Sequence, residues 1–199
     1  MRDKYEMQLR KLHAEMIEMG TMIEQAIETA IKALVAQDTE LAKKAIEADD
    51  AIDHQEREIE NLCLKLFLTQ QPVAGDMRNI SAALKMITDM ERIGDHASDI
   101  SELTLCMAGT PYIKKLEHVQ QMAKETIVML ASSIEAYVNA DEKKAKSVIA
   151  HDDVVDDLFD TIKNELIAMK SFILPIPVLC DISFTFVHTH FIEITSFRP

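Results

Sequence analysis

The chain has 199 residues and a formal net charge of −13, with 34 Asp and Glu against 21 Lys and Arg. This balance argues against a nucleic-acid-binding protein, because such proteins carry basic stripes that contact phosphates. Only four Gly, five Pro and no Trp are present, and the abundant Ala, Leu, Met, Glu and Lys favour helices over strands. The three cysteines are far apart and form no C-x-x-C motif, so we expect free thiols in a reducing cytosol.

The N-terminal segment MRDKYEMQLRKLHAEM is charged at helical intervals and lacks the apolar run of a signal peptide. Before residue 171 no window approaches the roughly 18 apolar residues of a membrane span. We therefore expect a soluble cytoplasmic protein without direct membrane insertion.

Apolar periodicity predicts three helices in the first part of the chain. Over residues 9–30 apolar side chains recur at intervals of three and four, the pattern of an amphipathic helix. Asp38 is a plausible N-cap for a second helix that begins directly after it. Pro72 and Gly75 interrupt the pattern, and a third helix is expected from there to Met107. Long helices with short connections predict an antiparallel bundle.

The third predicted helix carries a row of acidic residues. Glu91, Asp95 and Asp99 are four residues apart, so their carboxylates lie along one helix face. Because like charges at this spacing destabilise a helix by roughly 0.2–0.5 kcal/mol per pair, the row predicts an opposing positive charge. A metal ion, a basic partner, or Arg and Lys of a neighbouring helix would provide it. A solvated acidic face is the alternative interpretation.

The second half of the chain repeats the first at an offset of 103 residues. The segment AKKAIEADDAID (42–53) aligns without a gap with AKSVIAHDDVVD (145–156). The aligned pairs are Asp38 with Asp141, Asp50 with Asp153, Asp53 with Asp156 and Ile59 with Ile162. A register that continues from one helix into the next is hard to obtain by chance, so we infer two copies of one three-helix unit.

The composition changes from residue 171 onward. Residues 171–199 hold five of the seven Phe, three of the five Pro and no Lys, and Pro175 and Pro177 would break a helix. The offset predicts a second acidic row near residues 194 and 198, but these positions are Ile194 and Arg198. The segment is therefore interpreted as a replaced tail, either from a frameshifted or truncated reading frame or as a genuine β-like extension.

The segment from residue 71 to residue 100, QPVAGDMRNISAALKMITDMERIGDHASDI, resembles the third-helix signature of the PhoU family. That signature has the form P-x-A-x-D-L-R followed by L-K-x-x-x-D-L-E-R-I-G-D-x-A. Its first part matches here at Pro72, Ala74, Asp76, Met77 and Arg78. The resemblance covers residues 1–170. It implies an all-α fold of two tandem three-helix bundles, with a first bundle at 1–109, an incomplete second bundle at 110–170 that lacks its normal third helix, and an atypical tail at 171–199.

The resemblance also implies a function. It suggests a negative regulator of phosphate uptake and of the phosphate-starvation response, which contacts the ATPase of the phosphate ABC transporter and a phosphate-sensing histidine kinase. We further expect a homodimer. Family members bind metal ions through E/D-x-x-x-D motifs, and the missing second motif leaves one such cluster.

Acidic residues of two helices form the candidate metal site. The third helix offers Glu91, Asp95 and Asp99; the second offers Asp50 and Asp53, with Asp49 beside them. With no Cys or His at ligand spacing, these oxygens suit Mg²⁺, Ca²⁺, Mn²⁺ or iron better than structural zinc. The expected cofactor is a divalent or iron-type ion (Mg, Mn, Fe or Zn), its identity open.

Catalytic signatures are missing from the sequence. It contains no Glu-x-x-His pair of the kind that di-iron bundles need, and no P-loop, G-x-S-x-G or paired Cys–His signature. We therefore expect no enzyme. Two other classes stay open, a metal-binding helical bundle that is a storage protein or a metalloenzyme, and a metal-free helical adaptor.

Overall fold

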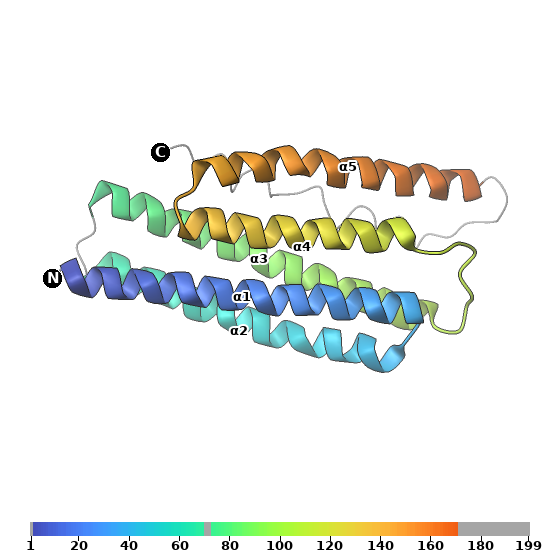
Figure 1. Cartoon of the computed structure of the whole chain (residues 1–199). Coiled ribbons are helices and arrows are strands. Elements are labelled where there is room, and N and C mark those ends of the chain that lie inside the picture. Colours follow the sequence, from blue (N-terminus) through green and yellow to red (C-terminus); the bar gives the residue numbers. More distant parts are fainter. Residues whose placement is uncertain (1, 70–72, 171–199) are drawn as a thin grey trace.

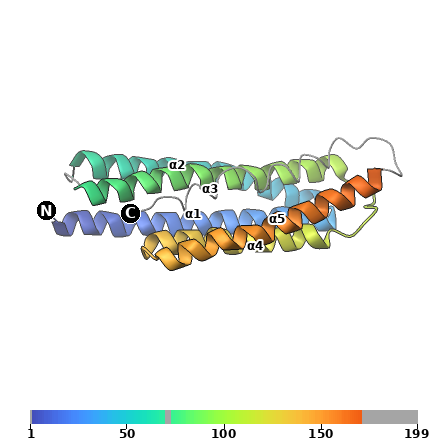
Figure 2. The same cartoon turned by 90° about the horizontal axis from the view of Figure 1, so that it is seen from above.

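The computed structural model describes residues 2–69 and 73–170, and in this part every regular element is a helix. The elements are α1 (Arg2–Ala36), α2 (Thr39–Thr69), α3 (Ala74–Met107), α4 (Glu117–Val138) and α5 (Glu142–Lys170). They run alongside one another in an elongated bundle (Figures 1 and 2). The prediction of an all-α fold is confirmed. The predicted tail at 171–199, and with it the missing sixth helix, lies outside the described residues.

Helices α1, α2 and α3 share one hydrophobic core. The predicted start of the second helix at residue 39 and the predicted end of the third at Met107 both agree with the structure. Side chains that are completely or almost completely buried come from all three helices. They include Leu12, Met16, Met19, Ile23, Ile27, Ile52, Ile59, Leu66, Ile80, Ile87 and Met90.

None of the helices in the described ranges is long and apolar enough to cross a membrane.

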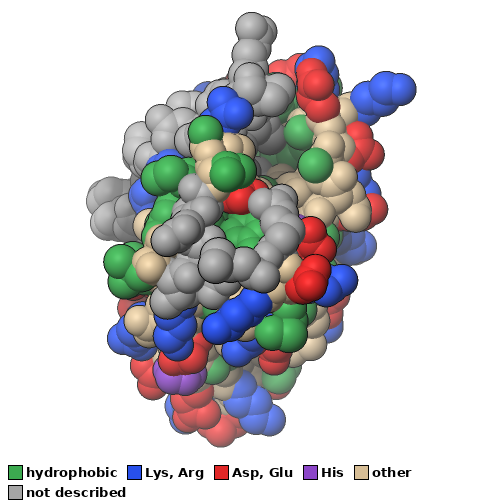
Figure 3. Space-filling view, turned by 90° about the vertical axis from the view of Figure 1, so that its left-hand side faces the viewer, with side chains coloured by type: hydrophobic (Ala, Val, Ile, Leu, Met, Phe, Trp, Pro, Cys, Tyr) green, Lys and Arg blue, Asp and Glu red, His purple; other side chains and the backbone are tan. Residues whose placement is uncertain are grey.

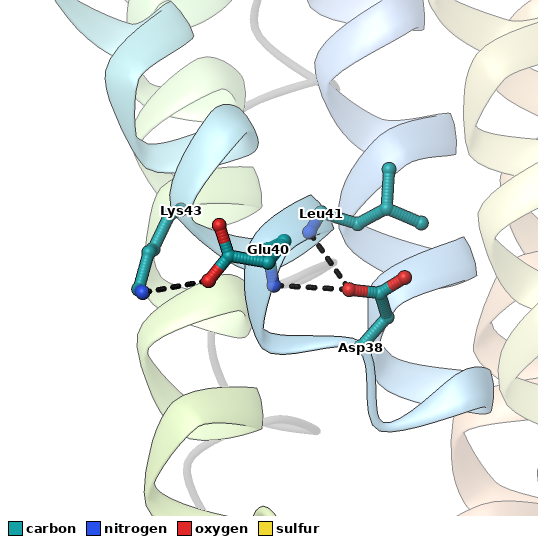
Figure 4. A network of polar contacts seen from close by, with 4 residues as sticks. All are labelled: Asp38, Glu40, Leu41 and Lys43. Carbon is teal, nitrogen blue, oxygen red and sulfur yellow. Dashed lines mark hydrogen bonds and ion pairs between the residues drawn. The ribbon is translucent and has the colours of Figure 1, made fainter.

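Asp38 caps the start of α2, as its position in the sequence predicts. Its Oδ1 accepts hydrogen bonds from the backbone N–H groups of Glu40, at 2.9 Å, and Leu41, at 3.1 Å (Figure 4). In the same turn, Lys43 Nζ lies 2.8 Å from Glu40 Oε1. The cap satisfies two backbone donors that would otherwise have no partner within the helix.

The same turn recurs before α5. Asp141 Oδ1 accepts hydrogen bonds from the N–H groups of Lys143 and Lys144, both at 3.0 Å. The residue before each cap has a left-handed backbone, with φ of 52° at Gln37 and 51° at Ala140. Because both turns keep the 103-residue offset, the structure confirms the internal repeat there.

The buried positions of α5 also repeat those of α2. The equivalent core pairs are Ala45 with Val148, Ile52 with Val155 and Ile59 with Ile162. In α2 these residues belong to the large core, whereas in α5 they form a small second core with Met122 and Met129 of α4. The two halves therefore use one helix pattern in two different packing environments.

Helix α4 joins the two halves by packing against α1. Its residue Ile134 belongs to the core of the first bundle. Two tyrosines add hydrogen bonds between the halves: the Tyr112 hydroxyl donates to the Leu34 carbonyl at 2.7 Å, and the Tyr137 hydroxyl donates to the Asn79 carbonyl at 3.0 Å. The predicted domain limits at 109 and 170 remain predictions.

Candidate metal centre

Helices α2 and α3 approach each other closely at Gly94. A Cβ atom at this position would lie 3.1 Å from both Cδ1 and Cγ2 of Ile52, closer than side chains normally pack. The missing side chain of Gly94 therefore allows α2 to approach α3 closely here. Asp95 and Asp53 follow these two residues directly, so the same contact brings their helix turns together.

Three carboxylates meet at this approach. One oxygen from each of Asp49, Asp53 and Asp95 lies within 4.8 Å of the other two, and each residue is partly buried. Asp49 and Asp53 are one helix turn apart, so they share a face of α2. The structure therefore brings together Asp53 and Asp95, two of the predicted ligands, with Asp49, which the sequence analysis placed beside them.

The crowding of negative charge changes the protonation of these groups. Burial and then the charges of the neighbouring Asp95 and Asp53 together raise the pKa of Asp49 to about 6. Burial, followed by the charge of Asp95, likewise raises the pKa of Glu91 to about 7. The pKa of Asp95 is also raised, first by burial and then by Asp53 and Asp99. These carboxylates are costly to ionise together unless a cation lies between them.

A buried oxygen of Asp49 that has no hydrogen bond also fits a bound cation. Asp49 Oδ1 is buried and accepts no hydrogen bond from any residue that the structure describes. A buried carboxylate oxygen without a partner is unfavourable. The nearby arginines interact with the other two carboxylates of the cluster. Arg57 lies 3.6 Å from Asp53 Oδ2, and the charge of Arg92 lowers the pKa of Asp95. An oxygen-only donor set of this kind suits a hard cation.

The other predicted ligands surround the three carboxylates. Glu91 lies one turn before Asp95 on α3 and is partly buried, whereas Asp50 and Asp99 are exposed. Asp99 Oδ2 lies 3.6 Å from Nδ1 of His96, and the charges of Asp50 and Asp99 contribute to the raised pKa of Asp49. Their role as ligands stays a prediction.

The sequence did contain a signal for Asp49. Asp49 and Asp53 have the same four-residue spacing as Glu91 and Asp95, which identifies a shared helix face. The predicted ligand Asp50 is adjacent to Asp49 and therefore points about 100° away on the helix.

The comparison with known families agrees with the repeat. The family model of the PhoU domain matches residues 16–104 and 119–188, and the starts of the two segments keep the repeat offset. The chain belongs to the PhoU family. The second matched segment runs past residue 170 into the tail, beyond the range of the resemblance described above.

Relatives and solved structures support the same assignment. A PhoU homolog of Clostridium acetobutylicum, named a phosphate-specific transport system accessory protein, is 39% identical over 168 residues, or 84% of this chain and 77% of the relative. The homolog of Aquifex aeolicus is 35% identical over 159 residues, or 80% and 72%. The crystal structure of PhoU from Pseudomonas aeruginosa has a TM-score of 0.80 and 26% identity, covering 92% of this chain and 87% of that one.

Proposed function

We propose that the chain is a negative regulator of phosphate uptake and of the phosphate-starvation response. It works in the cytoplasm by contacting the ATPase of the phosphate ABC transporter and the phosphate-sensing histidine kinase. The observation that carries the proposal is the similarity to accessory proteins of the phosphate-specific transport system over about four fifths of the chain. Long helices with acidic faces suit docking on basic protein surfaces, so the regulator acts by contact and not by catalysis.

A reporter strain tests the regulatory role. The chain is expressed in a bacterium that lacks its own PhoU and carries a reporter under a phosphate-starvation promoter. With abundant phosphate the chain restores repression, whereas an empty vector leaves the reporter active. Purified transporter ATPase and kinase are tested separately for binding. If the chain binds neither protein and leaves the reporter derepressed, the proposed function is wrong.

The proposal includes a homodimer and a bound cation. The cation is a hard divalent or iron-type ion at Asp49, Asp53 and Asp95, with Glu91 as the nearest further ligand. When bound, it supplies the positive charge that these carboxylates lack. The buried Asp49 oxygen without a hydrogen bond and the raised pKa of Asp49 support this site.

Elemental analysis of the purified protein separates the remaining alternatives. The proposal predicts a small fixed number of ions per chain, held in one cluster. A storage bundle would accumulate many ions per chain. A metalloenzyme of the di-iron type is disfavoured because the sequence has no Glu-x-x-His pair. A protein that binds no cation when Mg²⁺, Mn²⁺, iron or Zn²⁺ is supplied would be the metal-free adaptor.

A further inference from the structure

The two halves of the chain meet where α4 packs against α1. Both views of the fold show these helices side by side (Figures 1 and 2), and Leu130 and Ile134 of α4 belong to the core of the first bundle. At Gly20 of α1 the packing is so tight that an added Cβ atom would overlap Cδ1 of Ile134. Because closely packed interfaces shift between discrete arrangements and do not deform gradually, this contact sets the position of the second half.

A second contact between α1 and α4 joins two titratable side chains. The rings of His13 and Tyr137 pack edge to face, with their centroids 5.5 Å apart and an angle of 76° between their planes. His13 lies two turns before Gly20 on α1, and Tyr137 lies one turn after Ile134 on α4, so both contacts belong to one interface. The Tyr137 hydroxyl donates a hydrogen bond of 3.0 Å to the Asn79 carbonyl of α3, which holds the tyrosine in place.

The imidazole of His13 lies where a second proton is unfavourable. Its Nε2 atom is buried and forms no hydrogen bond with the described parts of the chain. A neutral imidazole has one N–H group, whereas the imidazolium ion has two and carries a positive charge. A buried charged donor without an acceptor costs more free energy than a buried neutral nitrogen. Burial accordingly lowers the pKa of His13 from its ordinary value of 6.5.

The groups around the ring pair do not compensate for this cost. Burial raises the pKa of the Tyr137 hydroxyl, and Cys63 of α2 and Tyr5 of α1 lie close enough to raise it further. Tyrosine and cysteine side chains are neutral near pH 7 unless their pKa values are lowered. Helix α3 contributes the uncharged Asn79. Around His13 these three helices therefore supply aromatic, thiol and amide groups and no carboxylate that would favour an imidazolium.

The charged groups nearby lie on the surface. Arg10 is one turn before His13 on α1 and is exposed, and its positive charge does not favour a second one. Figure 3 views the end of the molecule at which α1 begins, and the described side chains visible there include acidic and basic groups in mixture. Exposed charges of mixed sign largely cancel and are screened by salt. The protonation of His13 is therefore governed by its contact with α4.

We propose that the His13–Tyr137 contact is a pH-sensitive joint between the two halves of the chain. While His13 is neutral, the joint holds α4 on α1. When the imidazole takes up a second proton, the contact loosens and α4 is released together with α5, which begins four residues after α4 ends. Histidine suits this role because its charge changes between about pH 5 and pH 8. The joint needs neither the metal centre nor the proposed partners.

Hydrogen exchange of the full chain tests the joint. Exchange of the backbone amides is followed by mass spectrometry at pH 5.5 and pH 7.5, with a chelator present, and is corrected for the intrinsic rate at each pH. In the wild type, protection of the last turns of α4 is expected to fall by about three- to tenfold at pH 5.5. About tenfold is the limit for one group with an ordinary pKa of 6.5, because pH 5.5 is one unit below that value.

Local exchange is measured in place of global unfolding for a physical reason. The raised pKa values of Asp49 and Glu91 act in the opposite direction on the stability of the whole chain. Exchange of the α4 amides reports the contact with α1 separately from that effect.

Two variants separate the histidine from the aromatic contact. His13→Phe keeps a ring on Tyr137 but cannot be protonated, so the loss of protection at pH 5.5 is expected to disappear. Tyr137→Phe keeps the histidine and a ring but loses the hydrogen bond to Asn79, so protection is lower at both pH values and still falls at pH 5.5. His118→Gln is the matched control and retains the wild-type response, because His118 lies at the other end of α4 and contacts Glu165 of α5.

The NMR signals of the His13 imidazole in the wild type provide a measurement that needs no variant. Assigned through their connectivity to the backbone, they are expected to titrate below pH 6.5. A titration above pH 6.5, or protection of α4 that increases in acid, would show that the Tyr137 ring holds the imidazolium by a cation–π contact, and would overturn the joint. Protection of α4 that does not change with pH would overturn it too, as would an unchanged pH response in His13→Phe.

Discussion

The two halves of the chain begin their second helices, α2 and α5, with the same Asp cap. They differ in the surroundings of the acidic residues on those helices. Asp53 on α2 is partly buried and faces Asp95 of α3, whereas its counterpart Asp156 on α5 is exposed. Among the residues with described positions, the cluster on α2 and α3 has no equivalent on α4 and α5. An Asp-x-x-Asp pattern on one helix is therefore not a site by itself. The site arises where a second acidic helix packs against it.

The largest expected effect comes from the core positions that the two halves share. Ile52 is 1% exposed and lies against Gly94, while its counterpart Val155 is 2% exposed in the small second core. Ile52→Ala is expected to lower the free energy of unfolding by about 2–5 kcal/mol. Val155→Ala is expected to lower it by about 1–2 kcal/mol. The loss is smaller because this substitution removes fewer carbon atoms than Ile52→Ala, and because Val155 lies in the smaller core.

Urea unfolding followed by circular dichroism measures both core variants. Because Ile52 separates α2 from α3 beside the carboxylates, Ile52→Ala should also reduce cation binding, and Val155→Ala should not. Equal losses of stability at the two positions would contradict the difference between the cores.

The two helix caps should make nearly equal contributions. Asp38 and Asp141 accept the same pair of backbone hydrogen bonds, so replacing either with Ala is expected to cost about 1 kcal/mol. The free energies of unfolding of the two variants are compared with that of the wild type. Asp153→Ala, which removes an exposed carboxylate from the interior of α5, serves as the control. A cost at one cap only would show that the repeat is not equivalent there.

The smallest expected effect is a pH dependence confined to the first half. The pKa of Asp49 is raised to about 6 and that of Glu91 to about 7, above their ordinary values of 3.8 and 4.5. Between about pH 4 and pH 7 the cation-free folded state therefore binds more protons than the unfolded chain. Its free energy of unfolding falls as pH rises through this window.

Thermal unfolding in the presence of a chelator measures this slope. Asp49→Asn is expected to flatten it, whereas Asp153→Asn, an exposed position in the second half, leaves it unchanged. Cation affinity should change in the opposite direction and increase from pH 5 to pH 7, because metal ligands must be deprotonated. A stability that rises with pH in the cation-free protein would contradict the crowding of these carboxylates.

Local signals in the sequence predicted most of the fold. The Asp38 cap predicted the start of α2, and the third helix was expected to end at Met107, as α3 does. The contact of Tyr112 with the Leu34 carbonyl joins residues that are far apart in the chain, and no local pattern predicts such a pairing. For Asp49 the spacing from Asp53 identifies the shared helix face, but whether that face meets α3 depends on how α2 rotates against α3.

The site was therefore predicted to the level of helices and faces, and less well to the level of ligands. Asp53 and Asp95 are both in the predicted ligand set, and the structure brings them together. Asp50, which was predicted as a ligand together with Asp53, is exposed. Which of two adjacent acidic residues faces the neighbouring helix is decided by tertiary packing.

The cation content of matched variants tests the central claim most directly. Asp53→Asn with Asp95→Asn removes two carboxylates from the cluster, and Asp156→Asn changes the position equivalent to Asp53 in the second half. Each protein is loaded with Mn²⁺, passed through a desalting column and analysed for bound metal. The double variant is expected to lose the ion that the wild type holds, while Asp156→Asn retains it. Unchanged metal in the double variant, or its loss in Asp156→Asn, would contradict a centre built by α2 and α3.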